Sequence, residues 1–263
     1  MNAVRESQTH KSRRHDMKAI ERSISALKSA QYILKDLENI PVEILPLPLT
    51  TEGEPLFEPC FFEPYREPFQ DPDPKENYPS YGVIEDWELS PMDWARDVYS
   101  YLDRYIADVT LNDTKLFFGQ HSPKDLPTRT GPLWEYETCR DYRFAWRDTA
   151  GCSVPDGPQY KCMMLDDVDT DDACITRGEL LCICRLMIKS LSVCAYVDHM
   201  IAPIMLLSFL GPRHARILLA HYDGKKLIIR KSELFDCRKK NIPAFRVLLR
   251  WWCSSAAGDT VSA

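Results

Sequence analysis

The stretch of sequence that most constrains the fold is residues 202–235, APIMLLSFLGPRHARILLAHYDGKKLIIRKSELF. Within it, residues 204–210 form a continuous apolar run, which is typical of a buried strand. A Gly-Pro pair ends that run, and two more alternating segments follow at residues 217–222 and 227–235. These two segments are joined by Asp-Gly, which is a strong signal for a β-hairpin. We therefore expect a strand followed by a hairpin in this region.

Two helices are signalled by their capping residues. Ser90 precedes a proline at the first helical position, and Asp93 can reach back to it as in a capping box. Thr176 and Glu179 repeat the capping-box spacing in front of an apolar helix, which we expect to be central and buried. A last helix is predicted over residues 243–253, where apolar side chains gather on one face.

The N-terminal region divides into two parts. Residues 1–14 are polar and basic and predict a disordered leader. Residues 15–40 place apolar side chains at helical spacing from Ile20 to Leu37, which predicts an amphipathic helix. Such a helix normally packs on a core, and the alternative is a helix that binds a partner or associates with itself.

Residues 41–80 differ in kind because they hold ten of the nineteen prolines, spaced among acidic and aromatic residues. Repeated proline removes backbone donors and fixes φ, so neither a helix nor a central strand is expected. The aromatic side chains are too numerous for a plain solvated linker. We therefore predict an extended arm, partly polyproline II, whose aromatic side chains lie against the folded body. A recognition segment for another protein is the alternative.

These patterns predict an α+β fold with a small, mostly antiparallel sheet that ends in a C-terminal β-hairpin and is packed by several helices, plus the extended Pro-rich arm. Residues 111–172 are expected to be largely irregular. The predicted organisation is a disordered leader (1–14), an amphipathic helix (15–40), a Pro-rich acidic arm (41–80), a globular α+β domain (81–253) and a disordered tail (254–263).

Composition points to a soluble intracellular protein. Hydrophobic residues make up 44% of the chain, which is enough for a core. The first residues lack an apolar signal-peptide region, and the longest apolar run, residues 201–210, is too short to span a bilayer. We expect a cytoplasmic location, with the nucleus as the alternative, and no contact with a membrane.

The ten cysteines show no C-x2-C spacing, so we expect buried reduced thiols and neither a metal nor a cofactor.

Charge is distributed unevenly. Residues 203–253 carry eleven Lys or Arg against three Asp or Glu, while residues 41–110 carry four against sixteen. One interpretation is a nucleic-acid interface on the basic hairpin. Its candidate residues are Arg213, Arg216, Lys225, Lys226, Arg230 and Lys231. The competing interpretation is that the acidic arm folds over the basic sheet and neutralises it within the chain.

Residue spacing argues against two metal-dependent functions. The acidic run at residues 166–172 fails the calcium-loop test, because Asp172 stands where glycine is needed and Gly178 stands where a glutamate is needed. A solvated acidic loop before a helix explains the run. A nuclease of the PD-(D/E)XK type, with Glu179 and Asp223 as magnesium ligands, is an architectural resemblance only, because lysine precedes glutamate in Lys231-Ser232-Glu233.

No catalytic residues can be assigned from motifs. The chain contains no G-x-S-x-G elbow, glycine-rich phosphate loop or H-E-x-x-H arrangement. A small-molecule site would have to be built from dispersed residues. The candidate pocket residues are Trp134, Glu135, Tyr136 and His214.

The block LLSFLGPRHARILLAHYDGKKLIIRKSELFD, the downstream FRVLLRWWCSS and the PLFEPCFF segment resemble a family of uncharacterised proteins from filamentous fungi. The resemblance covers most of the chain beyond residue 40. It implies a lineage-restricted protein, and some such proteins look like neighbours of secondary-metabolite or toxin gene clusters. The resemblance supplies no activity and no catalytic residues.

Three functions follow from these observations. The first is binding to an unidentified protein partner, in a role accessory to a biosynthetic pathway. The second is nucleic-acid binding, or a degenerate nuclease-like fold, through the basic hairpin. The third is a small-molecule enzyme with a dispersed site.

Overall fold

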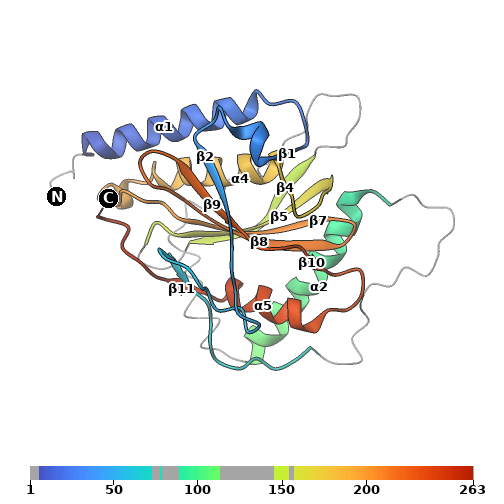
Figure 1. The fold of residues 1–263 in the computed structure, drawn as a ribbon. Coiled ribbons are helices and arrows are strands. Elements are labelled where there is room, and N and C mark those ends of the chain that lie inside the picture. Colours follow the sequence, from blue (N-terminus) through green and yellow to red (C-terminus); the bar gives the residue numbers. More distant parts are fainter. Residues whose placement is uncertain (1–5, 73–77, 79–88, 113–144, 154–156, 263) are drawn as a thin grey trace.

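The computed structural model describes residues 6–72, 78, 89–112, 145–153 and 157–262 and has three layers (Figure 1). A twisted mixed sheet forms the middle layer. Helices α1 (Gln8–Ser25) and α4 (Arg177–Ser190) cover one face, and α2 (Pro91–Asn112) and α5 (Ile242–Trp252) cover the other. Each face of the sheet therefore has a hydrophobic core of its own.

The central sheet has seven strands among the described residues. Its order is β2 (Val42–Pro46), β9 (Leu227–Lys231), β8 (His214–Tyr222), β7 (Ile204–Gly211), β5 (Tyr160–Asp169) and β4 (Trp146–Ser153), with β10 (Phe235–Asp236) also paired to β8. The β2–β9 and β5–β7 pairs are parallel, and the other pairs are antiparallel. The predicted α+β class with a mostly antiparallel sheet is confirmed, although the sheet is larger than the sequence suggested.

Shorter elements complete the fold. Strand β1 (Gln31–Ile33) pairs with β6 (Cys174–Thr176), and β3 (Phe62–Glu63) pairs with β11 (Ser255–Ala256). Two 3-10 helices, η1 (Leu34–Leu37) and η2 (Cys194–Tyr196), follow β1 and α4. None of the helices in the described ranges is long and apolar enough to cross a membrane.

The local signals of the C-terminal half are confirmed. At the start of α4, the Glu179 N–H donates to the Thr176 hydroxyl at 3.0 Å, and the Thr176 N–H donates to the Glu179 carboxylate at 2.9 Å. The β8–β9 hairpin turns at Gly224, whose φ of +100° explains the glycine of the Asp-Gly pair. Helix α5 lies within one residue of its predicted bounds.

The predicted N-terminal boundaries are wrong. Helix α1 begins at Gln8, inside the expected disordered leader, and ends at Ser25 instead of residue 40. The apolar spacing beyond Ser25 belongs to β1 and η1, because Arg177 N–H donates to the Ala30 carbonyl and so holds this segment beside β6. The predicted disordered tail is also wrong, since it forms β11 and buries Thr260.

The expectation that residues 111–172 are irregular is wrong for the described part of that range, which contains β4 and the central β5. Lys161 and Asp166 make β5 look irregular in the sequence, and each of these buried side chains has a specific partner. Lys161 is buried and donates to the carbonyls of Trp252 (2.6 Å) and Ser254 (2.9 Å) at the end of α5. The sequence also suggests a pair of short strands over residues 142–146, of which residues 142–144 lie outside the described part of the chain and Trp146 begins β4.

The Pro-rich arm begins in the sheet and then crosses onto α5. Its first part is β2, an edge strand, which proline tolerates. Beyond it, Phe62 is buried in the core beneath α5, and the Tyr65 N–H donates to the Arg250 carbonyl at 3.1 Å. The Trp251 indole donates to the Gly53 carbonyl at 3.0 Å. The aromatic residues of the arm therefore pack within the chain, as the first interpretation predicted.

The described cysteines are free thiols, but only some of them are buried as expected. Those at 162, 182, 184, 237 and 253 are buried free thiols. Cys194 departs from the expected burial, because α4 ends at Ser190 and Cys194 is exposed in η2.

Candidate interaction site

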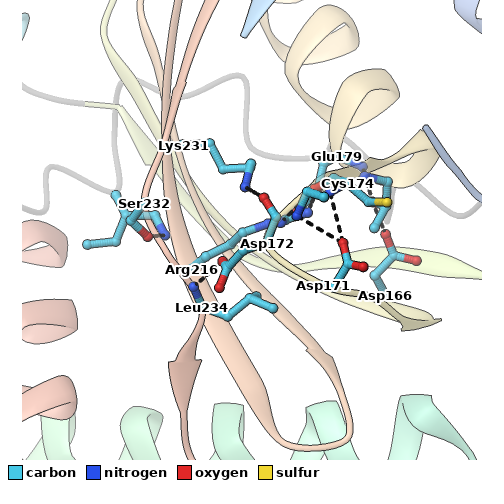
Figure 2. Close-up of polar contacts among 12 residues, drawn as sticks. Asp166, Asp171, Asp172, Cys174, Glu179, Arg216, Lys231, Ser232 and Leu234 are labelled. Carbon is cyan, nitrogen blue, oxygen red and sulfur yellow. Dashed lines mark hydrogen bonds and ion pairs between the residues drawn. The ribbon is translucent and has the colours of Figure 1, made fainter. Parts of the chain in front are cut away.

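A row of charged side chains crosses the α4-facing side of the sheet at one end (Figure 2). Asp166 comes from β5, Arg216 from β8, Lys231 from β9, and Glu179 from the first turn of α4. Charged side chains are rarely buried unless they are paired, so the burial of each of these four side chains requires a partner.

Glu179 and Arg216 form a fully buried ion pair, with 0% of either side chain exposed. The Arg216 Nε donates to Glu179 Oε1 at 2.7 Å, Nη2 donates to Oε2, and Nη1 donates to the Cys174 carbonyl at 2.9 Å. Burial alone would raise the pKa of Glu179, but the adjacent guanidinium outweighs it and lowers the pKa below its usual value. Glu179 is therefore an ionised carboxylate whose oxygens are already occupied.

Asp166 lies beside this pair in the opposite protonation state. It is 1% exposed and accepts a hydrogen bond from the Thr176 hydroxyl. Burial raises the pKa of Asp166 to about 8, the nearby Glu179 charge adds to the rise, and the Thr176 bond opposes it. A Cβ at Gly178 would lie 2.5 Å from Asp166 Oδ2, so glycine permits this close approach. The expected solvated loop is therefore wrong for Asp166, which is a buried strand residue.

Lys231 ties β9 to the turn before β6. Its Nζ donates to the Asp172 carbonyl at 2.7 Å, and the Leu234 N–H donates to Asp172 Oδ1 at 2.7 Å (Figure 2). Partial burial lowers the pKa of Lys231, and the neighbouring Arg216 charge lowers it further, partly offset by Glu179. A lysine has three N–H donors, and one of them is used here.

Two pockets flank the segment Lys231-Ser232-Glu233 and the end of β2. The larger, of about 600 Å³, lies towards α5, and its lining includes Leu47, Leu49, Phe235 and Val247. The smaller, of about 340 Å³, lies towards η1 and β6. Its lining includes Leu34, Ile44, Asp172, Cys174 and Lys231. Ligand pockets in proteins are of this size and are mainly apolar with a few polar groups.

The smaller pocket is bordered by an exposed apolar side chain. Among the described residues, four large hydrophobic side chains are exposed, and two of them are neighbours, Ile33 (43%) and Leu34 (54%). Leu34 also lines the pocket. We call Ile33, Leu34, β2 and the two pockets the edge surface. An exposed apolar patch beside a pocket is typical of an interaction site.

The predicted nucleic-acid residues are scattered by the fold. Arg216 is buried against Glu179, and Arg213 is 7% exposed and paired with Asp97 at 3.0 Å. As folded, neither can reach a phosphate. Lys225 and Lys226 are exposed on the hairpin turn, Arg230 is half-buried, and Lys231 is tied as described above.

The Pro-rich arm forms two ion pairs with basic side chains of the C-terminal region. Lys226 pairs with Glu43 at 3.1 Å, and Arg246 pairs with Asp71. In addition, Arg230 lies over the Phe57 ring, 4.5 Å from its centre. The arm therefore supplies acidic and aromatic partners to this surface, in keeping with the interpretation of internal neutralisation.

The proposed magnesium ligands of a nuclease are not brought together. Glu179 contacts Arg216 near the start of β8, whereas Asp223 follows the end of β8 and accepts the Lys225 and Lys226 N–H groups at 2.7 Å. In the described ranges, no group of three or more His, Cys, Asp or Glu could hold a metal ion.

The predicted small-molecule pocket cannot be assembled from the structure. Residues 134–136 lie outside the described residues, and His214 opens β8 opposite Asp236 and lines neither pocket. Sequence reasoning missed Asp166 and Leu34. Leu34 falls within the helix predicted for residues 15–40, but it follows β1 in the structure and is exposed there.

Comparisons of the chain with protein-family models, with curated proteins and with solved structures find no match. The resemblance to filamentous-fungal proteins, the pathway role and the cytoplasmic or nuclear location therefore remain predictions from the sequence.

Proposed function

We propose that this protein acts by binding another protein, and that the edge surface is its binding site. The observation that supports the proposal is the pairing of exposed apolar side chains with pockets. Leu34 lines the smaller pocket, the exposed Ile33 precedes it in the chain, and Pro46 lines both pockets. Exposing two adjacent aliphatic side chains is unfavourable in water unless a partner covers them.

The walls of the larger pocket are held in place before any partner binds. On one side, the arm is fixed by the Trp251 hydrogen bond to Gly53, and a Cβ at Gly53 would lie only 3.1 Å from Val247. On the other side, Asn241 caps α5 by accepting the Ala244 N–H at 3.1 Å. A preformed site loses less conformational entropy on binding.

A library of random 12-residue peptides displayed on phage tests this function. We expect panning on the whole protein to enrich peptides with recurring apolar positions. Leu34→Asp should weaken their binding at least tenfold, because it places a charge in the apolar contact. The matched control is Val261→Asp, since Val261 is 51% exposed and lines neither pocket. Failure to enrich any peptide, or equal loss in both variants, would exclude the edge surface as a peptide-binding site.

Nucleic-acid binding is a second candidate, favoured by one arrangement on α1. Lys11, Lys18 and Arg22 are exposed and are spaced i, i+7 and i+11, which places them in one stripe opposite the buried side of the helix. Three such cations would support weak, salt-sensitive contact with phosphates.

Fluorescence anisotropy with single- and double-stranded DNA and RNA at two salt concentrations tests this candidate. We expect binding that falls steeply with salt and that the pair Lys18→Glu and Arg22→Glu weakens at least tenfold. The control is Lys239→Glu, an exposed cation in the loop between β10 and α5. Binding that is absent at low salt would remove the candidate.

A further inference from the structure

The outer edge of β2 carries free backbone hydrogen-bonding groups. In its parallel pairing with β9, the Leu227 N–H donates to the Pro41 carbonyl and the Leu47 N–H donates to the Lys231 carbonyl. In this pattern the backbone N–H and carbonyl groups of residues 43 and 45 face β9. The N–H and carbonyl of Ile44 therefore face away from β9. In the described part of the chain, β2 pairs with β9 alone. Ile44 therefore offers one donor and one acceptor at an open sheet edge.

The two pockets lie on opposite faces of the sheet at this edge. The smaller is lined by Ile44 and Ile175, which belong to or pack on the core beneath α1 and α4. The larger is lined by Leu47 and Val247, which belong to or pack on the core beneath α5. Both pockets also share Pro46 and the 231–233 segment. Successive side chains of a strand point to opposite faces, so one added strand could fill both pockets.

We propose that the partner adds an extended strand to the outer edge of β2, with the partner's backbone bonded to Ile44 and its successive side chains entering the two pockets. This inference rests on the proposed protein-binding function and specifies its mode. In such strand addition, main-chain bonds supply affinity and the pockets supply specificity.

The lining of each pocket defines the side chain that it takes. The larger pocket, lined by Leu49 and Phe235 among others, suits a bulky apolar side chain. The smaller holds the Lys231 ammonium, which has one donor on the Asp172 carbonyl and two further donors. It therefore suits a short side chain with a hydrogen-bond acceptor. The partner strand is expected to carry an acceptor residue directly next to a bulky apolar one.

The same edge is built to accept only a short strand. Pro46 has no N–H, and its carbonyl already accepts from Arg230 at 3.4 Å. The Val42 N–H donates to the Ile40 carbonyl at 2.7 Å. Proline and a charged residue such as Glu43 are common means by which edge strands avoid unspecific pairing. The open groups are thus confined to the middle of β2.

The test uses the peptide that binds tightest among those enriched by the library. Ile44→Pro removes the outward N–H and spares the β9 ladder, whereas Ile44→Ala shortens the side chain and keeps the N–H. We expect Ile44→Pro to raise the Kd at least tenfold relative to Ile44→Ala. On the wild-type protein, N-methylation along the peptide should weaken binding at the one residue whose N–H donates to the Ile44 carbonyl and spare the residues on either side of it, because their amides face away from β2.

Each result bears on a different claim. Equal Kd values for the two variants, together with an N-methyl scan in which no single amide stands out from its neighbours, would overturn strand addition while leaving protein binding in place. If Ile44→Pro fails to fold by circular dichroism, the N-methyl series decides alone. A peptide that binds only through a self-associated form, seen as a dimer in light scattering, would assign the edge to a second copy and overturn the partner strand.

Discussion

Glu179→Gln is expected to lower the free energy of unfolding by about 3–5 kcal/mol, because it leaves the buried Arg216 charge without its counter-ion. Arg216 is 0% exposed and directs three nitrogens at Glu179 and the Cys174 carbonyl. Glutamine can still accept and donate at the start of α4, so the capping geometry is retained and the lost charge is isolated. Urea denaturation at pH 7 measures the change.

The matched control is Glu21→Gln. Glu21 also pairs with an arginine, Arg185 at 3.0 Å, but both side chains are partly exposed, at 20% and 27%. Pairs in contact with solvent contribute less than about 1 kcal/mol, so this variant should be close to the wild type. A loss below about 1 kcal/mol for Glu179→Gln as well would show that Arg216 is solvated in the protein.

A double-mutant cycle separates the interaction energy of Glu179 and Arg216 from the cost of burying either charge alone. Arg216→Met should be as damaging as Glu179→Gln, because it strands the carboxylate in the core. The variant that carries both changes should be less destabilised than the sum of the two, since it buries no unpaired charge. Strictly additive losses would contradict a direct interaction.

Asp166→Asn is expected to stabilise the protein above about pH 6 and to remove a pH dependence. The pKa of Asp166 is raised to about 8 in the folded protein, chiefly by burial, whereas an unfolded aspartate ionises near 3.9. The folded state thus holds a proton that the unfolded chain releases. This contribution to stability is complete below about pH 4 and is lost as pH rises to about 8, by up to about 1.4 kcal/mol per pH unit.

Urea midpoints from pH 5 to pH 8.5 measure this effect. The wild type should lose stability across the range, and Asp166→Asn should lose less, because its neutral amide can still accept from the Thr176 hydroxyl. Asp169→Asn, at an exposed position on the same strand, is the control and should follow the wild type. Parallel curves for all three proteins would show that Asp166 is ionised in the fold.

Local chemistry made parts of this fold predictable. The Thr176–Glu179 capping box, the Asp-Gly turn and the apolar run of β7 each act over a few residues, so their sequence signals survive unchanged. In the candidate site, these signals located Glu179 at a helix start. They could not identify its partner, because Arg216 lies 37 residues away in the sequence.

The parts of the fold that the sequence did not predict depend on contacts between residues far apart in the chain. Lys161 and Asp166 make β5 look like a loop, and only the carbonyls at the end of α5 and the Thr176 hydroxyl account for their burial. Likewise, the apolar spacing after Ser25 continues a helical period but is used by a strand, because β6 is available for pairing. Tertiary context thus overrode local pattern where a polar residue found a remote partner.

The pairing of β2 with β9 has a consequence for biosynthesis. Arg230 and Pro46, which meet in this pair, are separated by 184 residues, whereas β7, β8 and β9 follow one another directly. As the ribosome releases the chain from its N-terminus, β2 emerges long before the strand that it joins. Until β9 is made, both edges of β2 are open and its aliphatic residues are exposed to neighbouring nascent chains. The prolines and acids that surround β2 then act as gatekeepers against premature aggregation.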